Sequence, residues 1–175
     1  MDIKEKGYRL NVGIIVANSD GKLLYCKRKN STNWQFPQGG IDKNEDIFDA
    51  ALRELFEEVG IEKNKVKLIK ESDNWYKYDL PKKYKRNSFL WESFKGQKQK
   101  WFLFKLIEET KIDLNNENNP EFDEFNWVDY WKPLDEIVDF KREIYEKVLT
   151  ELEPAYKSEF SLSLIHISEP TRPLY

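Results

Sequence analysis

One segment, residues 46–59, restricts the fold of this chain more than any other. Placed on a helix at about 100° per residue, its apolar side chains share one broad face, which predicts packing against a core. These side chains are Phe48, Ala51, Leu52, Leu55 and Val59. Glu54, Glu57 and Glu58 are related by i, i+3 and i+4, so they share the neighbouring face. The sequence therefore predicts an amphipathic helix with three crowded carboxylates.

Two interpretations of the three carboxylates are open. They repel one another, and Arg53, four residues before Glu57, can neutralise only part of the set. The helix can present an ordinary solvated acidic face, or the carboxylates can hold a hard cation such as Mg²⁺ or Mn²⁺. A structural zinc site does not fit, because neither Cys nor His accompanies them. Helix spacing alone does not decide between the solvated face and the cation site.

The rest of the chain mixes strand and helix patterns. Strand patterns occupy residues 8–17, 22–28, 65–70, 101–107 and 125–128, and helical spacing returns from Pro133 to about Glu151. The Asp20-Gly21 pair predicts a turn that joins the first two strands into a hairpin. Because strands and helices do not alternate regularly, we expect an α+β fold rather than a doubly wound one. The length suits one domain, which we expect over residues 1–155.

Composition and cysteine content predict a cytoplasmic protein. Hydrophobic residues make up 39% of the 175 residues and the net charge is −3, which fits a folded chain without uniform affinity for nucleic acid. Cys26 is the only cysteine, so an internal disulfide is impossible and a reducing compartment fits. The first ten residues lack an apolar signal core, and no apolar run approaches a membrane span. We therefore expect no membrane partner.

The end of the chain changes character. Residues 161–175, SLSLIHISEPTRPLY, hold two prolines and the only histidine, and they look similar to a translated cloning adaptor. We expect residues 156–175 to be a disordered or non-native tail, and we assign His166 no role.

Charge is concentrated in two neighbouring segments. Residues 82–100 hold seven Lys or Arg and one acid, whereas residues 108–125 hold seven acids and one base. Both can be solvated loops. The basic segment also mildly favours a long polyanion as the partner.

The loop before the glutamate helix completes a longer pattern. Residues 39–61, GGIDKNEDIFDAALRELFEEVGI, resemble the Nudix box at nine specified positions: Gly39, Glu45, Arg53, Glu54, Leu55, Glu57, Glu58, Gly60 and Ile61. Further segments between residues 7 and 150 resemble the bacterial RNA pyrophosphohydrolase subfamily of the Nudix hydrolases. These are GYRLNVGIIV, WQFPQGG, GQKQKWF, PEFDEFNWV and FKREIY. Residues 82–95 do not match that subfamily.

The resemblance implies a fold and an activity. The fold would be a Nudix-type α/β/α sandwich with a mixed β-sheet between helices. The activity would be a Mg²⁺-dependent hydrolysis, with Mn²⁺ as an alternative and more than one ion expected. It would remove pyrophosphate from the 5′-triphosphate end of RNA, or phosphate from a 5′-diphosphate end, leaving 5′-monophosphate RNA and initiating mRNA decay. Two alternatives stay open: a dinucleoside polyphosphate hydrolase, and a non-catalytic nucleotide- or RNA-binding module. Whether a protein activator exists is also open.

The resemblance also assigns roles to individual residues. The expected catalytic residues are Arg53, Glu54, Glu57 and Glu58, and the expected metal ligands are the Gly39 carbonyl, Glu54, Glu57, Glu58 and Glu121. Arg53 would orient a box glutamate, and Glu45 would brace the loop rather than bind metal. The expected substrate contacts are Arg9, Asn11, Arg28, Tyr78, Gln97, Lys98, Lys100, Phe140 and Lys141. Phe140 can stack on a base, or it can continue the apolar face of the last helix.

Overall fold

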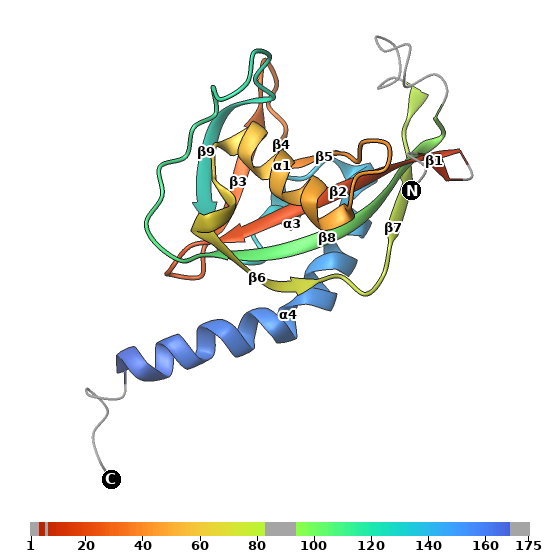
Figure 1. Ribbon diagram of the computed structural model, residues 1–175. Helices are drawn as coiled ribbons and strands as arrows, with labels where there is room; N and C mark the ends of the chain where they lie inside the picture. The colour runs from red at the N-terminus through yellow and green to blue at the C-terminus, as the bar shows by residue number, and fades with distance from the viewer. Residues whose placement is uncertain (1–3, 6, 83–93, 169–175) are drawn as a thin grey trace.

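One mixed sheet organises the molecule (Figure 1). The computed structural model describes residues 4–5, 7–82 and 94–168, with side chains over 7–82 and 94–161. The strands in these residues are β1 (Lys4–Glu5), β2 (Tyr8–Ala17), β3 (Leu23–Arg28), β4 (Trp34–Gln35), β5 (Gln38–Gly40), β6 (Val66–Glu71), β7 (Tyr76–Asp79), β8 (Gly96–Leu106) and β9 (Phe122–Val128). The helices are α1 (Ile47–Val59), α3 (Pro133–Glu136) and α4 (Asp139–Ser168), with a 3-10 turn, η1, at Lys63–Lys65. The strand order β4-β3-β2-β8-β6 contains crossovers, as expected for an α+β fold.

The parallel pair β2 and β8 forms the centre of the sheet. Their register runs from Tyr8 beside Gly96 to Ala17 beside Lys105. Side chains alternate between the two faces along each strand, and both faces are buried over most of this pair. Burial on both sides explains the long apolar runs that predicted these strands.

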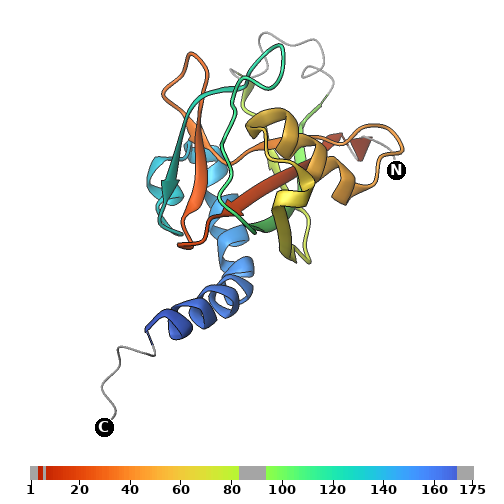
Figure 2. The ribbon, with the colours of Figure 1, turned by 60° about the vertical axis from the view of Figure 1, so that its left-hand side comes forward.

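Helices cover both faces of the sheet, which confirms the α/β/α sandwich. On one face, Leu55 of α1 joins a buried cluster with Val12 and Phe102. On the other face, Tyr145 of α4 packs with Trp101 in a second cluster. Figures 1 and 2 show α1 and α4 on opposite sides of the sheet.

The expected first hairpin exists only at its tip, where Ala17 pairs with Leu23. Gly21 closes the turn with a φ of +78°, which favours glycine. Beyond the tip, β5 takes the place of β3 beside β2, and β3 pairs with β9 instead. Because of this exchange of partners, Gly39 and Gly40 pair with β2 and lie beside α1.

Two strands begin earlier than their apolar patterns predicted. β8 starts at Gly96 rather than residue 101, and β9 starts at Phe122 rather than residue 125. The first residues of β8 are polar, so hydrophobicity gives no strand signal there.

The expected helix from residue 133 is interrupted and then runs further than predicted. Ile137 has an extended ψ of 147°, which ends α3 before α4 starts. α4 then continues past Pro154 to Ser168. The domain end expected at residue 155 therefore falls inside α4.

The first part of the expected tail is packed on the domain. The Tyr156 hydroxyl donates to the Gly21 carbonyl at 2.5 Å, and Phe160 is 6% exposed. The expectation of disorder is therefore wrong for residues 156–161. Residues 169–175 lie outside the described residues, and a non-native origin of 161–175 stays a prediction.

One residue of the expected helix core is more exposed than predicted. Phe48, in the first turn of α1, is 37% exposed. Its ring still contacts the rings of Phe102 and Phe104, with centroids 6.0 and 6.1 Å away. Among the described residues, no helix has the length and apolar character needed to cross a membrane.

Candidate active site

Both ends of α1 are fixed by caps. The Asp46 carboxylate accepts a hydrogen bond from the Asp49 N–H at 3.2 Å, which caps the N-terminus. Gly60 ends the helix with a φ of +72°, and its N–H bonds back to the preceding turn at 2.9 Å. With the helix fixed in this way, Glu54 and Glu58 lie one turn apart on its buried side.

A close approach of β5 to α1 encloses these carboxylates. A Cβ atom at Gly39 would lie 2.0 Å from the carboxyl carbon of Glu54, so any larger residue there would displace this carboxylate. The N–H of Gln38 donates to Glu58 Oε2 at 3.2 Å. Glu54 and Glu58 are 9% and 6% exposed. The structure thus brings the glycine loop and the glutamates together.

Arg53 ties the glycine loop to the helix. Its Nε and Nη2 donate to the Glu45 carboxylate at 2.8 and 2.9 Å. Its Nη1 donates to Glu54 at 2.8 Å and to Glu57 at 3.2 Å, and Nη2 also donates to the Gly40 carbonyl at 2.9 Å. The hydrogen bond from Arg53 lowers the pKa of Glu45. These contacts agree with the bracing roles expected for Arg53 and Glu45.

The two enclosed glutamates carry an electrostatic cost. Burial raises the pKa of Glu54 to about 7, although Arg53 acts in the opposite direction. Burial also raises the pKa of Glu58 well above its usual range, and the charges of Glu54 and Glu121 add to this effect. Buried carboxylates that repel one another are unfavourable unless a cation balances them.

The donor set fits a divalent cation by its chemistry. Carboxylate and carbonyl oxygens are the ligands that Mg²⁺ and Mn²⁺ prefer. Within the described ranges, no three acidic, His or Cys side chains converge as a finished metal cluster. Glu121 instead lies near Arg28, with Oε2 3.6 Å from Nη2. The fit therefore rests on the buried, mutually repelling oxygens, and the ligand roles stay a prediction.

Sequence reasoning missed one acid of this site. Glu117 lines the same pocket as Glu57 and Glu121. Burial raises its pKa, and the charges of Glu57 and Glu121 raise it further. Its sequence signal was only membership of the acidic segment 108–125, which does not distinguish it from its neighbours.

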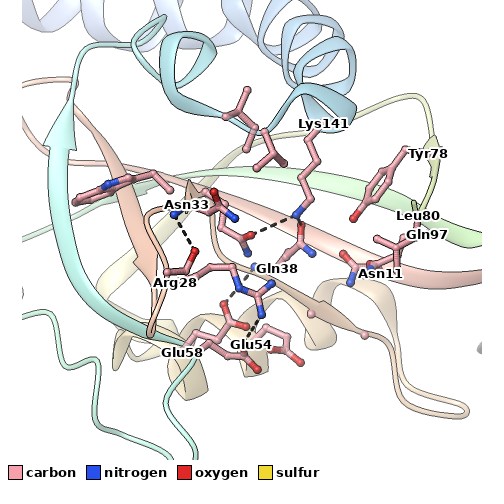
Figure 3. Close-up of a pocket in the computed structure, with 18 of the residues that line it drawn as sticks. Asn11, Arg28, Asn33, Gln38, Glu54, Glu58, Tyr78, Leu80, Gln97 and Lys141 are labelled. Atoms are coloured by element: carbon pink, nitrogen blue, oxygen red, sulfur yellow. Dashed lines mark hydrogen bonds and ion pairs between the residues drawn. The ribbon is translucent and has the colours of Figure 1, made fainter. Parts of the chain in front are cut away.

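A cavity of about 640 Å³ extends from the glutamates to α4 (Figure 3). Figure 3 shows Glu54 and Glu58 at one end and Lys141 across from them. The expected substrate contacts that line the cavity are Arg9, Asn11, Arg28, Tyr78, Gln97, Phe140 and Lys141. Carboxylates therefore stand at one end with Arg28 beside Glu121, and Lys141 stands with amide and aromatic groups at the other.

Lys141 is the most deeply buried cation of the cavity, with 5% exposed. Its Nζ lies 3.3 Å from Gln35 Oε1 and 3.4 Å from Gln38 Oε1. Burial lowers the pKa of Lys141 to about 7, and the nearby Arg28 charge acts in the same direction. An anionic ligand in the cavity would favour the charged form.

Buried amides connect the two ends of the cavity. Gln99 Nε2 donates to Asn11 Oδ1 at 2.8 Å and to Gln38 Oε1 at 3.1 Å. Gln38 Oε1 also faces Lys141, while the Gln38 N–H bonds to Glu58. Gln38 was not predicted as a site residue, because an isolated glutamine gives no sequence signal of its burial.

The far end of the cavity has groups suited to a planar base. The rings of Tyr78 and Phe140 have centroids 5.8 Å apart, and Lys141 Nζ lies 5.8 and 5.9 Å from them. Tyr78 OH and Gln97 Oε1 are buried without a hydrogen-bond partner among the described residues. Phe140 is half-buried and lines the cavity, so its ring serves the pocket as well as the helix face.

Two expected substrate contacts do not line the cavity. Lys98 and Lys100 alternate along β8 with Gln97 and Gln99, so they project from the opposite face of the sheet. Their Nζ atoms instead lie 5.6 and 5.8 Å from the ring of Trp75. Lys98 and Lys100 therefore do not line this cavity, and a contact with substrate outside it stays a prediction.

The fold and the carboxylate site are those of the Nudix hydrolases, and this chain belongs to the Nudix family. The family model of the NUDIX domain matches residues 7–148.

Relatives of higher sequence identity within this family are named RNA pyrophosphohydrolase. The RNA pyrophosphohydrolase of Haemophilus ducreyi is 43% identical over 169 residues, covering 93% of this chain and 86% of that protein. The RNA pyrophosphohydrolase of Vibrio cholerae is 47% identical over 149 residues, covering 83% of this chain and 84% of that protein.

Solved structures share the fold at lower identity. The dihydroneopterin triphosphate pyrophosphohydrolase of E. coli matches with a TM-score of 0.65 and 19% identity, covering 83% of this chain and 99% of that chain. An Ap4A hydrolase of C. elegans, as a binary complex, matches with a TM-score of 0.59 and 17% identity, covering 82% and 98%. At these identities the structures confirm the fold alone.

Proposed function

We propose that this chain hydrolyses the 5′-triphosphate end of RNA to a 5′-monophosphate end, releasing pyrophosphate, and that it accepts a 5′-diphosphate end with release of phosphate. The main support is the cavity of about 640 Å³, in which buried glutamates face cationic and aromatic side chains. The identity of 43–47% to relatives named RNA pyrophosphohydrolase supports the same substrate. An RNA substrate and a single buried cysteine, Cys26, fit a cytoplasmic location.

The carboxylate end would hold the reacting phosphates through metal. The residues that would bind Mg²⁺, or Mn²⁺, are the Gly39 carbonyl and the carboxylates of Glu54, Glu57, Glu58 and Glu121. The bound ions would neutralise the phosphate chain, polarise a P–O bond and lower the pKa of the attacking water. Arg53 holds Glu54 in position, either to bind an ion or to accept the proton of that water.

The opposite end would hold the nucleotide part of the substrate. Lys141 supplies positive charge at this end, and Arg28, 3.6 Å from Glu121, supplies it nearer the carboxylates, where it can meet the phosphates. Phe140 and Tyr78 supply ring faces on which a base can stack. The unpartnered Tyr78 OH and Gln97 Oε1 offer a donor and an acceptor to the base edge.

A product assay tests this function. RNA with a labelled 5′-triphosphate is incubated with and without Mg²⁺, and we expect labelled pyrophosphate and monophosphate RNA only with the metal. Glu58→Gln should abolish turnover, whereas Glu143→Gln, an exposed acid on α4, should not change it. RNA left intact in the presence of Mg²⁺ and of Mn²⁺ would refute the proposal.

Competition with diadenosine tetraphosphate separates the small-nucleotide alternative. The small nucleotide should compete weakly if the pocket serves RNA, and turnover of it without turnover of RNA would establish the alternative. A binding module without catalysis is disfavoured by the complete set Arg53, Glu54, Glu57 and Glu58, since one missing carboxylate would suffice to inactivate the site.

A further inference from the structure

A second charged surface lies on the α1 side of the sheet, where β7 and β8 turn their other side chains toward the cavity. We call it the lysine–aromatic patch, and it consists of Tyr8, Trp75, Lys77, Lys95, Lys98 and Lys100. None of these residues lines the cavity.

Strand register explains why the patch adjoins the cavity without being part of it. In the pairing of β7 with β8, Tyr78 lies beside Gln97, and Lys77 lies beside Lys98. Tyr78 and Gln97 face the cavity. Because side chains alternate along a strand, Lys77 and Lys98 project from the other face. The same two strands therefore build both surfaces.

Two aromatic rings order the ammonium groups of the patch. Lys98 and Lys100 approach the half-buried ring of Trp75 to 5.6 and 5.8 Å. Two further lysines approach the Tyr8 ring to 5.2 and 5.8 Å. Cation–π contacts of this kind hold a lysine in place and leave its charge intact.

The charge of the patch is poorly neutralised within the protein. Among the described residues, no carboxylate oxygen lies within 4.0 Å of the Nζ of Lys77, Lys95 or Lys100. Lys100 donates to the main-chain carbonyl of Asp73 at 3.2 Å, which does not cancel its charge. The Asp79 carboxylate accepts a hydrogen bond from the Tyr8 hydroxyl at 2.5 Å. The patch thus presents net positive charge.

The patch and the cavity meet at the end of β7. Leu80 lines the cavity, and its N–H donates to the carbonyl of Lys95 at 3.0 Å. In the described sheet β7 pairs with β8 alone, so its outer edge is free of another strand. A chain that leaves the cavity past Leu80 therefore reaches Lys95 by turning around this edge.

We propose that the lysine–aromatic patch binds the single-stranded RNA that follows the 5′ end held in the cavity. This inference rests on the proposed function for the identity of the polyanion. Lysines two residues apart on a strand stand about 7 Å apart, which is comparable with the phosphate spacing of an extended single strand. Ordered lysines beside a half-exposed ring suit sequence-independent binding of single strands. A purely acidic protein segment would use the charges but would have no planar group to pack against the half-exposed Trp75 ring.

Binding of RNA that cannot react tests the patch by itself. A labelled 5′-hydroxyl strand of about 16 nucleotides is titrated by fluorescence anisotropy. The variant is Lys77→Gln/Lys95→Gln/Lys100→Gln. The control, Lys63→Gln/Lys111→Gln/Lys147→Gln, removes the same charge from exposed lysines elsewhere. At about 0.7 per phosphate contact, the slope of log K against log salt should fall by about 2 in the patch variant. The affinity should fall roughly 10- to 100-fold at about 0.1 M salt.

Three results would overturn the proposal. The patch variant could keep wild-type affinity and slope, the control could weaken binding as much, or poly-glutamate could compete as well as RNA. Circular dichroism checks that each variant is folded. Hydrolysis of a 5′-triphosphate dinucleotide is measured with the same proteins, and the patch variant should hydrolyse it at the wild-type rate. If the wild type binds RNA through the patch but hydrolyses no triphosphate end, the proposed function fails and the patch stands.

Discussion

Replacing Lys141 with methionine should stabilise the protein. Lys141 is 5% exposed, and burial lowers its pKa from the ordinary 10.5 to about 7. At 1.36 kcal/mol per pKa unit, this difference corresponds to about 5 kcal/mol of lost stability. The variant leaves the oxygens of Gln35 and Gln38 without this donor, which costs about 1 kcal/mol each. We therefore expect Lys141→Met to be more stable by about 3 kcal/mol at pH 7.

The pH dependence gives the sharper test of this reasoning. The unfolded chain binds the Lys141 proton more tightly than the folded protein, so wild-type stability gains from rising pH between about 7 and 10.5. The advantage of the variant should therefore shrink by about 1.4 kcal/mol per pH unit in that range. It should be constant below pH 7, where the amine is charged in both states.

Urea unfolding at several pH values measures the effect. Lys147→Met, on the exposed side of the same helix, serves as the control and should follow the wild type at every pH. The reasoning is refuted if the curves of wild type and Lys141→Met stay parallel from pH 7 to 10. It is also refuted if the variant is less stable at pH 7. The stabilised variant should bind triphosphate RNA more weakly, because the positive charge that faces the cavity is lost.

Two further predictions concern the carboxylate end, and a third concerns the buried amides of the cavity. Glu58→Gln should raise the unfolding temperature of the metal-free protein in EDTA, because one buried charge is removed, and it should remove the stabilisation that Mg²⁺ gives the wild type. Gly39→Ala should lower kcat at least tenfold, because its Cβ would displace the Glu54 carboxylate. An unchanged kcat in steady-state kinetics would contradict this. Gln99→Leu should raise KM more than it lowers kcat, since Gln99 orients two amides of the cavity without lining it.

The carboxylate site was predictable because its parts are close in sequence. Gly39, Glu54 and Glu58 lie within twenty residues, and helix periodicity with one glycine loop brings them together. The interaction of Arg53 with Glu57 followed from the same spacing and is present at 3.2 Å. Helix geometry therefore placed the three glutamates on one face, whereas the match to the Nudix box was needed to predict them as one site with the glycine loop.

The face on which Lys98 and Lys100 project was not predictable in the same way. β8 is buried on both sides from Trp101 to Phe104, so its apolar run contains no alternation that marks an inner face. Only the register with β2 and β7 shows that Gln97 faces the cavity and its neighbours do not. Register is a tertiary property, and residue types along one strand do not encode it.

The end of the domain was misjudged for a related reason. Helical spacing was followed only to about Glu151, whereas α4 continues past Pro154, with Tyr156 hydrogen-bonded to the Gly21 carbonyl and Phe160 buried. Tertiary burial outweighed the local signal. A protein shortened at residue 155 would therefore lose part of its core.

The position of Gln38 has a thermodynamic consequence. Its main-chain N–H is bound to Glu58, and its side-chain oxygen is shared by Gln99 and Lys141. One residue thus spans the two halves of the cavity, and a shift of it at either end alters hydrogen bonds at the other. Any free energy of coupling that results must be reciprocal. If a bound base raises the affinity of the site for a cation, the bound cation must raise the affinity for the base by the same factor.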